Sequence, residues 1–231
     1  MNLLLEGTDN VQVRPISKEE MPQIKDWILK NHYIKRWPTG VGPNGRLGVY
    51  IDGKLSGCLL YGPTLHPIAG STLFQKDSKP IISNNQCMEL LRAFTTDEAK
   101  EKVDNLGSII VARGNEFIRT HIKTKEGNPI KAILSYADPT AGHSGGVYKA
   151  TNATYLGPQK EGVVLIVKHP DGNSLEVHQM SLKPFGTQDI KKLQNMKLFK
   201  GTQLKWETRQ GKHKYLYALG KDQKDTCVFP V

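Results

Sequence analysis

Apolar residues recur at helical spacing in two stretches of the chain, and shorter apolar runs lie between and after them. The first stripe predicts an amphipathic helix over Lys18–Asn31. Ser17 and Glu20 have the spacing of a capping box at the start of that helix. The second stripe predicts a helix over Asn105–His121.

The remaining apolar residues alternate with polar ones or form short runs, a pattern that is typical of strands. A continuous apolar run over Ile130–Tyr136 predicts a strand buried on both faces, as in parallel sheets. In chain order, the predicted strands are Val11–Ile16, Leu47–Asp52, Leu55–Tyr61, Gln86–Thr96, Ile130–Tyr136, Ala153–Leu156, Val163–Lys168, Leu175–Gln179, Leu204–Thr208 and Tyr215–Leu219.

Turn residues and polar segments connect these elements. Asp52-Gly53 and Gln210-Gly211 each lie between two predicted strands and indicate hairpins. Short helices are predicted over Val147–Asn152 and over Gln188–Asn195, the latter capped by Thr187. The pattern predicts irregular structure in two further segments, Pro63–Asn84 and Asp97–Asp104.

The order of elements predicts an α/β (α+β) protein with a central sheet of mixed strand directions. The pattern changes after Gly157, where short strands and turns take over. We therefore expect a core over residues 1–157 and a basic, β-rich C-terminal extension over residues 158–231, packed on that core.

The length and composition fit one sizeable core. The chain has 231 residues, of which 38% are hydrophobic and 23% are charged. No apolar run approaches the roughly 18 residues of a membrane span, and the apolar start is too short for a signal peptide, so we expect a cytoplasmic protein. Three isolated cysteines without a CxxC pair indicate reduced thiols rather than a zinc site.

Positive charge indicates a nucleic-acid partner. The net charge is +10, and residues 158–231 hold 13 Lys and Arg against 7 Asp and Glu. Within this region Lys212, His213 and Lys214 run into a strand with aromatic residues. This pattern suits phosphate contacts with base stacking, and it equally suits an edge strand protected by lysines.

The densest group of candidate catalytic residues follows the predicted strand Ile130–Tyr136. Tyr136, Asp138 and His143 stand among small residues at the end of that strand. Pro139 holds Asp138 in an extended conformation. Ligand sites in α/β sheets lie at such strand ends, which favours an active site over a structural turn.

Two other segments combine polar groups with helix ends. Asn105, Gly107 and Ser108 open the second helix and fit an anion site, although no Walker motif is present and Asn105 also suits an ordinary N-cap. His32 and Tyr33 end the first helix, where the alternative is that His32 caps the helix and Tyr33 packs.

Several motifs together resemble the phage Mom family. The segment SYADPTAGHSGGVYKATNATYLG is similar to that family's signature, and other pieces match in order: NHY followed by RWP, GVYIDGKLSGCLLYG, ELLRAFTTDE, NLGS and GKHKYLYAL. The resemblance covers residues 28–157 well and residues 205–220 more loosely.

This resemblance implies a GNAT acetyltransferase-like fold with a mixed, mostly antiparallel sheet and flanking helices. It also implies an enzyme that makes N6-(carbamoylmethyl)adenine in double-stranded phage DNA and so protects it from host restriction enzymes. Acetyl-CoA is the implied cofactor, and iron is a secondary one. The remaining alternatives are a GNAT N-acetyltransferase acting on a small-molecule or protein amine, and a non-catalytic DNA-binding module.

The resemblance also assigns roles to residues. Asn105, Gly107 and Ser108 would bind the CoA pyrophosphate with help from Arg92, although the usual GNAT R/Q-x-x-G-x-G/A loop is missing. The residues at the reacting end would be Tyr136, Asp138, Tyr148, His32 and Tyr33. If a metal is bound, Asp138 and His143 or His32 are the candidate ligands. DNA contacts would come from Arg36, Lys212, His213 and Lys214.

Overall fold

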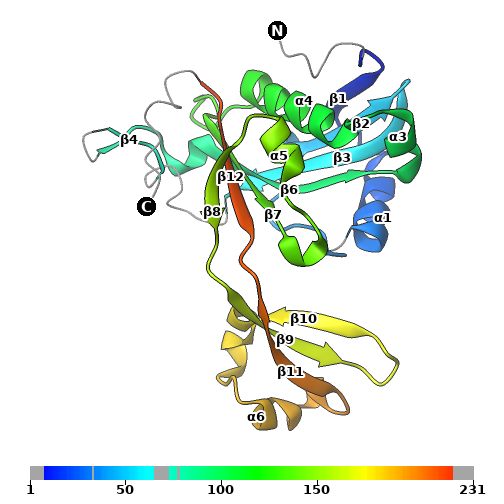
Figure 1. The fold of residues 1–231 in the computed structure, drawn as a ribbon, viewed down its shortest axis with the longest axis vertical. Helices are drawn as coiled ribbons and strands as arrows, with labels where there is room; N and C mark the ends of the chain where they lie inside the picture. The colour runs from blue at the N-terminus through cyan, green and yellow to red at the C-terminus, as the bar shows by residue number, and fades with distance from the viewer. Residues whose placement is uncertain (1–7, 33, 65–72, 77–78, 221–231) are drawn as a thin grey trace. The chain divides into compact units, whose positions relative to one another are not determined.

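The computed structural model describes residues 8–32, 34–64, 73–76 and 79–220. They form two compact units, which are described separately (Figure 1). The first comprises the described residues of Met1–Ala137, His143–Gly157 and His213–Val231, and the second comprises Asp138–Gly142 and Pro158–Lys212. The segment expected as a C-terminal extension is therefore divided, because its last described residues belong to the first unit.

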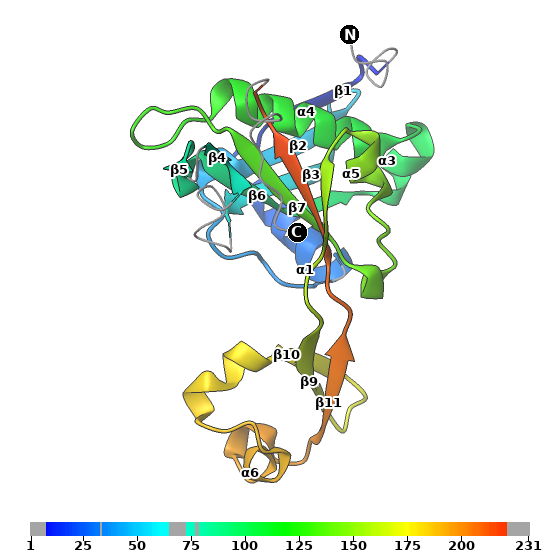
Figure 2. The same cartoon turned by 60° about the vertical axis from the view of Figure 1, so that its left-hand side comes forward.

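The first unit is built on a seven-stranded sheet with the order β1-β2-β3-β6-β7-β12-β8 (Figures 1 and 2). β6 and β7 are parallel, whereas β1–β2, β2–β3, β3–β6 and β7–β12 are antiparallel. The predicted mixed, mostly antiparallel sheet is thus confirmed. The strand bounds are β1 (Val11–Pro15), β2 (Arg46–Ile51), β3 (Lys54–Pro63), β6 (Cys87–Thr95), β7 (Ala132–Ala137), β8 (Thr154–Pro158) and β12 (His213–Ala218).

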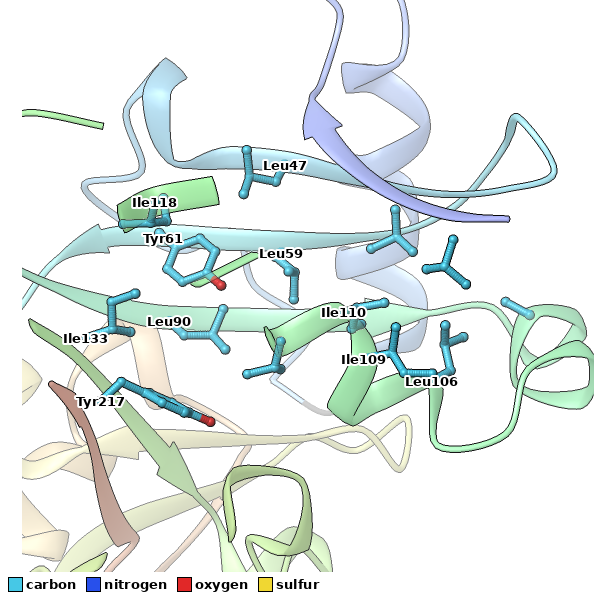
Figure 3. Close-up of a cluster of buried hydrophobic side chains, with 14 of the residues drawn as sticks. Leu47, Leu59, Tyr61, Leu90, Leu106, Ile109, Ile110, Ile118, Ile133 and Tyr217 are labelled. Atoms are coloured by element: carbon cyan, nitrogen blue, oxygen red, sulfur yellow. The ribbon is translucent and has the colours of Figure 1, made fainter. Parts of the chain in front are cut away.

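Helices cover both faces of this sheet. On β3, Leu59 and Tyr61 face α4 (Leu106–His121), and their neighbours Cys58 and Leu60 face α1 (Met21–Asn31). This alternation is the period of two that a strand imposes on its side chains. Figure 3 shows the α4 side of the core, where Leu59 and Tyr61 lie near the apolar side chains of α4. The two predicted long helices are confirmed.

The start of α1 differs slightly from the prediction. Ser17 and Glu20 do form the reciprocal backbone hydrogen bonds of a capping box, at 2.8 and 3.3 Å. The α-helix itself begins at Met21, because Pro22 occupies one of its first two positions, where its missing N–H is harmless. Lys18–Glu20 therefore form a turn rather than helix.

Two predictions of local structure were wrong. The expected loop Asp97–Asp104 contains α3 (Asp97–Lys102), which is capped by Thr96 and has acids in its first turn and lysines in its last. The expected hairpin around Gln210-Gly211 does not form, since β11 (Gln203–Arg209) pairs with β9 and β12 pairs with β7. In the expected irregular segment Pro63–Asn84, β4 (Gln75–Lys76) and β5 (Lys79–Pro80) form a small ladder.

The second unit is a three-stranded antiparallel sheet with the order β10-β9-β11. β9 (Gly162–Lys168) lies between β10 (Ser174–His178) and β11. A helical segment that includes α6 (Ile190–Gln194) connects β10 to β11. Leu165, Val167, Leu182, Leu193 and Phe199 form its buried core, so this unit has an apolar centre of its own.

Among the described residues, no helix combines the length and apolar character that a bilayer crossing requires. Cys58 and Cys87 are buried free thiols. Burial raises the pKa of each of these two thiols to about 12. Cys227 lies outside the described residues.

Candidate functional site

The parallel strands β6 and β7 separate part of the way along their length. They pair from Cys87 with Ala132 to Leu90 with Ser135. Both strands continue beyond the last pair, β6 to Thr95 and β7 to Ala137, without pairing with each other. Backbone groups on the facing edges are therefore left for another partner, as at the ligand-binding crevices of open mixed sheets.

A β-bulge lies in β6 at this point. Leu60 of β3 opposes Arg92 and Tyr61 opposes Leu90, so Leu91 has no opposing residue. A bulge bends its strand and turns backbone groups away from the ladder, and bulges are enriched beside active sites. Arg92 follows the bulge directly, and its Nη1 donates a hydrogen bond to the Leu91 carbonyl at 2.6 Å.

The N-terminus of α4 carries no side-chain cap. Asn105 occupies the N-cap position in the left-handed region (φ 54°), and its side chain accepts no hydrogen bond from the helix. Asn105 thus occupies the N-cap position, as the alternative expected, but without the side-chain hydrogen bond of an ordinary N-cap. The Ser108 amide donates to the Asn105 carbonyl at 2.9 Å, so the first-turn amides that remain for a ligand are those of Leu106 and Gly107, and the helix dipole favours an anionic ligand.

α5 (Gly146–Ala150) lies against this first turn of α4. A Cβ added at Gly107 would come within 3.1 Å of the Val147 side chain, so glycine permits the close approach. Ser108 is buried, with 6% of its surface exposed. Asn105 is exposed beside it. Of the three predicted pyrophosphate residues, Asn105 and Gly107 are thus more accessible than Ser108.

The Tyr148 side chain of α5 reaches the backbone of Tyr136 in β7, whose own side chain packs on the opposite face of the sheet. The Tyr148 hydroxyl donates a hydrogen bond to the Tyr136 carbonyl at 3.5 Å. The Tyr136 hydroxyl is buried and has no hydrogen-bond partner among the described residues. Burial, and then the negative charge of Glu89, raise the pKa of Tyr136 well above its ordinary value, so this phenol is a protonated donor at neutral pH.

Asp138 follows β7 in the chain and makes two kinds of contact. Its carboxylate accepts hydrogen bonds from the Thr140 amide (3.1 Å) and hydroxyl (2.5 Å), and it lies 3.5 Å from the Lys212 ammonium. Burial would raise the pKa of Asp138, but the Thr140 hydrogen bonds and the Lys212 charge outweigh it and hold the pKa below its usual value. Asp138 is therefore an ionised hydrogen-bond acceptor and only a weak base.

The residues at the end of α1 are placed differently. His32 is the C-cap of α1 and is buried, and its Nδ1 accepts a hydrogen bond from the Ile34 amide at 3.1 Å. α1 covers one face of the sheet, whereas Tyr148 packs with the α4 cluster on the other. Arg36 is exposed. Tyr33 lies outside the described residues.

β12 divides its side chains between the two faces of the sheet. His213 and Tyr215 point to the side of Tyr217, which packs with α4, and Lys214 points to the other side, opposite Tyr136 in the β7 register. The Tyr155 hydroxyl and His213 Nδ1 are 2.7 Å apart. The alternation along β12 thus places Lys214 on one face of the sheet and His213 with the tyrosines on the other.

Two residues that the sequence analysis did not select lie at the separation of β6 and β7. Ser135 is fully buried, and its hydroxyl has no hydrogen-bond partner in the described part of the chain. Glu89 is 4% exposed and carries the charge that acts on Tyr136. A polar residue inside an otherwise apolar strand was the available signal for both.

No group of three or more His, Cys, Asp and Glu side chains that could hold a metal occurs among the described residues. His32, Asp138 and His143, the candidate ligands of the sequence analysis, therefore do not gather into such a group. The donor set that the structure describes does not fit an iron site.

The fold and this site define the class of protein. A mixed sheet whose parallel strands separate beside an uncapped helix N-terminus is the arrangement of a GNAT acetyltransferase-like fold. The chain belongs to the Mom protein family, whose model matches residues 10–231. The resemblance stated from the sequence motifs is thus confirmed.

Similar solved structures are acetyltransferases. Spermidine N-acetyltransferase from Vibrio cholerae in complex with CoA and spermine has 8% identity and a TM-score of 0.48, covering 91% of this chain and 96% of that chain. A putative acetyltransferase from Salmonella typhimurium with its cofactor acetyl-CoA has 9% identity and a TM-score of 0.46, with 92% and 96% covered. A ribosomal-protein-alanine N-acetyltransferase from Brucella melitensis has 11% identity and a TM-score of 0.45, with 90% and 99% covered. A search of curated protein sequences gives no match.

Proposed function

We propose that this chain is a phage-encoded enzyme that converts adenine in double-stranded DNA to N6-(carbamoylmethyl)adenine and so protects the DNA from host restriction. Membership of the Mom family supports the DNA substrate and the type of modification. The observation that carries an enzymatic function is the separation of β6 from β7 beside the uncapped start of α4. The net charge of +10 is suited to a polyanionic substrate.

The residues at the separation fit acetyl-CoA, which would supply two carbons. Acetyl transfer alone does not make a carbamoylmethyl group, because the product also contains an amide nitrogen and is bonded to adenine through the methyl-derived carbon, so a further nitrogen-donating co-reactant and an oxidant are required. The Leu106 and Gly107 amides at the start of α4, together with Asn105, would meet the pyrophosphate. The facing edges of β6 and β7 offer backbone groups to the amides of an extended arm. The buried Ser135 hydroxyl has no partner among the described residues and would bind a polar atom of the cofactor.

The tyrosines and Asp138 have separate roles in this proposal. The Tyr148 hydroxyl, on the α4 face of the sheet, would donate to an oxygen or sulfur atom near the reacting carbon, whereas the Tyr136 phenol lies on the opposite face and contributes its backbone carbonyl to the Tyr148 contact. Asp138, held ionised by Thr140 and Lys212, accepts a hydrogen bond from the exocyclic amine of the target adenine. The lone pair of that amine is delocalised into the ring, so an oriented acceptor raises its reactivity as the bond forms.

Mass spectrometry of digested DNA from cells that express the chain tests the proposal. We expect a carbamoylmethyl mass addition on deoxyadenosine, and we expect it to be missing in cells that express Tyr148→Phe. Unmodified DNA together with an acetylated small amine would instead establish a GNAT N-acetyltransferase. Tight DNA binding with neither product would establish a non-catalytic binding module.

Calorimetry with acetyl-CoA tests the cofactor separately from the reaction. We expect saturable binding by the wild-type chain. Failure to bind acetyl-CoA at millimolar concentration would contradict the assignment of the β6–β7 separation as the acyl-cofactor site, whatever modification the DNA carries.

A further inference from the structure

The helical segment of the second unit, residues 183–200, concentrates positive charge. It holds five lysines and one acidic residue, Asp189. The Asp189 carboxylate caps α6 by accepting a hydrogen bond from the Lys192 amide at 3.2 Å. The five lysines are exposed, and none of them forms an ion pair with a described residue: Lys183, Lys191, Lys192, Lys197 and Lys200.

Packing turns these lysines outward. Leu182, Leu193 and Phe199 of this part of the chain are buried against Leu165 and Val167 of β9. Leu165 and Val167 are two residues apart and so lie on the same face of the strand. The segment therefore covers that face of the three-stranded sheet with its apolar side chains, and its lysines lie on the side away from the sheet.

On the opposite face of the same sheet most charged side chains are paired, and the exposed Lys168 is the lysine there that lies outside the ion pairs of the described residues. Arg209 pairs with Glu176 at 2.6 Å and with Glu207 at 2.8 Å, and Lys205 lies 3.4 Å from Glu207. Paired charges of opposite sign have little attraction for a distant polyanion. The positive charge of this unit that is free to act on a partner is thus concentrated on the helical segment.

We propose that the surface formed by residues 183–200 binds the sugar-phosphate backbone of duplex DNA, a partner that rests on the proposed function. Lysines are compact point charges that suit phosphates without selecting a base. The aromatic rings near this surface pack within the unit: Phe185 packs on Phe199, and the indole of Trp206 in β11 donates a hydrogen bond to the Gln188 carbonyl at 3.2 Å. This surface therefore holds DNA without stacking on bases, and base selection belongs to the first unit.

An anionic membrane is the competing partner for a lysine-rich surface. Leu198 is the large apolar side chain exposed on this segment, at 65%. One leucine buries little area in a bilayer, whereas amphipathic membrane helices have a continuous apolar face. In α6 that face is already occupied, since Leu193 is fully buried in the core of the unit.

The test compares two triple variants with the same change of net charge. Lys191→Ala/Lys192→Ala/Lys197→Ala removes charge from the proposed surface, and Lys18→Ala/Lys123→Ala/Lys125→Ala removes it from exposed positions of the first unit. Fluorescence anisotropy with a 20-base-pair duplex is measured without any cofactor, across a series of salt concentrations. Melting curves of both variants establish that they fold.

We expect the first triple variant to bind the duplex at least tenfold more weakly at low salt and to lower the log–log salt slope by about 2–3. The control variant should bind within about threefold of wild type, a general effect of net charge. A third variant, Lys191→Arg/Lys192→Arg/Lys197→Arg, should retain wild-type affinity. Equal losses in the two alanine variants would overturn the proposal, as would a wild-type chain that prefers phosphatidylserine vesicles to duplex DNA.

These outcomes are separable from failure of the proposed function. DNA that binds through the segment but carries no modified adenine would leave the surface assignment standing and contradict the enzymatic proposal. If the first triple variant instead keeps wild-type duplex affinity and still produces modified adenine at the wild-type level, the surface assignment is contradicted and the enzymatic proposal stands.

Discussion

The carboxylate of Asp138 lies 3.5 Å from the ammonium of Lys212, which is 74 positions further along the chain. The same carboxylate accepts two hydrogen bonds from Thr140. Asp138 therefore has a structural function in the turn after β7 as well as the chemical one proposed for it. The two functions make different predictions for a neutral replacement.

Asp138→Asn should abolish adenine modification while costing about 0.5–1 kcal/mol of unfolding free energy, because a partly exposed ion pair is lost and the turn is kept. Lys212→Met removes the same ion pair and serves as the control for stability. DNA digests and melting curves of both variants provide the readouts. Wild-type levels of modified adenine in Asp138→Asn would show that the residue only shapes the turn.

The pH dependence of stability follows from the lowered pKa of Asp138 in the folded chain. Because the pKa of Asp138 is lower in the folded chain than in the unfolded chain, where it is 3.8, the ionised carboxylate stabilises the fold at pH values above 3.8. This stabilisation is lost as the pH falls through the pKa of Asp138 in the folded chain. Denaturant titrations between pH 6 and pH 2 should therefore show a loss for wild type that is smaller in Asp138→Asn. Identical pH profiles would mean that the ion pair adds nothing.

Tyr148→Phe should reduce the modification rate by about 10²–10⁴ if its hydroxyl donates to the reacting group. Its hydrogen bond to the Tyr136 carbonyl is long, at 3.5 Å, so the melting temperature should change little. Tyr155→Phe is the matched control, since it removes a phenol that contacts His213. Loss of activity in both variants alike would indicate a general effect on the aromatic packing.

Asn105→Asp should act in opposite directions on stability and on cofactor binding. The added charge interacts favourably with the α4 dipole, but it would repel a pyrophosphate at the same helix end, weakening acetyl-CoA binding by about 1 kcal/mol, or fivefold. Asn152→Asp is the control, because Asn152 is also exposed and also has a positive φ, 61° against 54°. Calorimetry that finds equal affinities in the two variants would remove α4 from the cofactor site.

Gly145 has a positive φ of 77°, and a Cβ there would come within 2.1 Å of the Tyr215 hydroxyl. Gly145→Ala should therefore destabilise the chain by about 3 kcal/mol or more, since the backbone strain of about 1–2 kcal/mol is joined by a clash in a packed site. Gly142→Ala has the same strain (φ 76°) with open space around it. Chemical denaturation should show the smaller loss in Gly142→Ala, and equal losses would mean that Tyr215 moves freely.

Sequence pattern was sufficient for the elements that hold the site. β6, β7 and α4 have strong apolar periodicity and lie within a few residues of their predicted bounds, because local burial dictates both the period and the ends of each element. The motif around Tyr136 and Tyr148 also identified the family, since its residues are close together in the chain. α3 was missed because six mostly charged residues carry almost no apolar stripe.

Only the tertiary structure decided which segments pair and which polar groups remain without partners. The Gln210-Gly211 turn signal predicted a hairpin, but β12 pairs with β7, where Tyr215 and Leu216 are buried, and β11 pairs with β9. The contact of Asp138 with Lys212 likewise depends on residues far apart in the chain, and so does the burial of the Ser135 hydroxyl, which has no partner among the described residues. Sequence determined the period and ends of each element, because those follow from local burial. The neighbours of each strand followed from the packing of the whole chain, which no local pattern encodes.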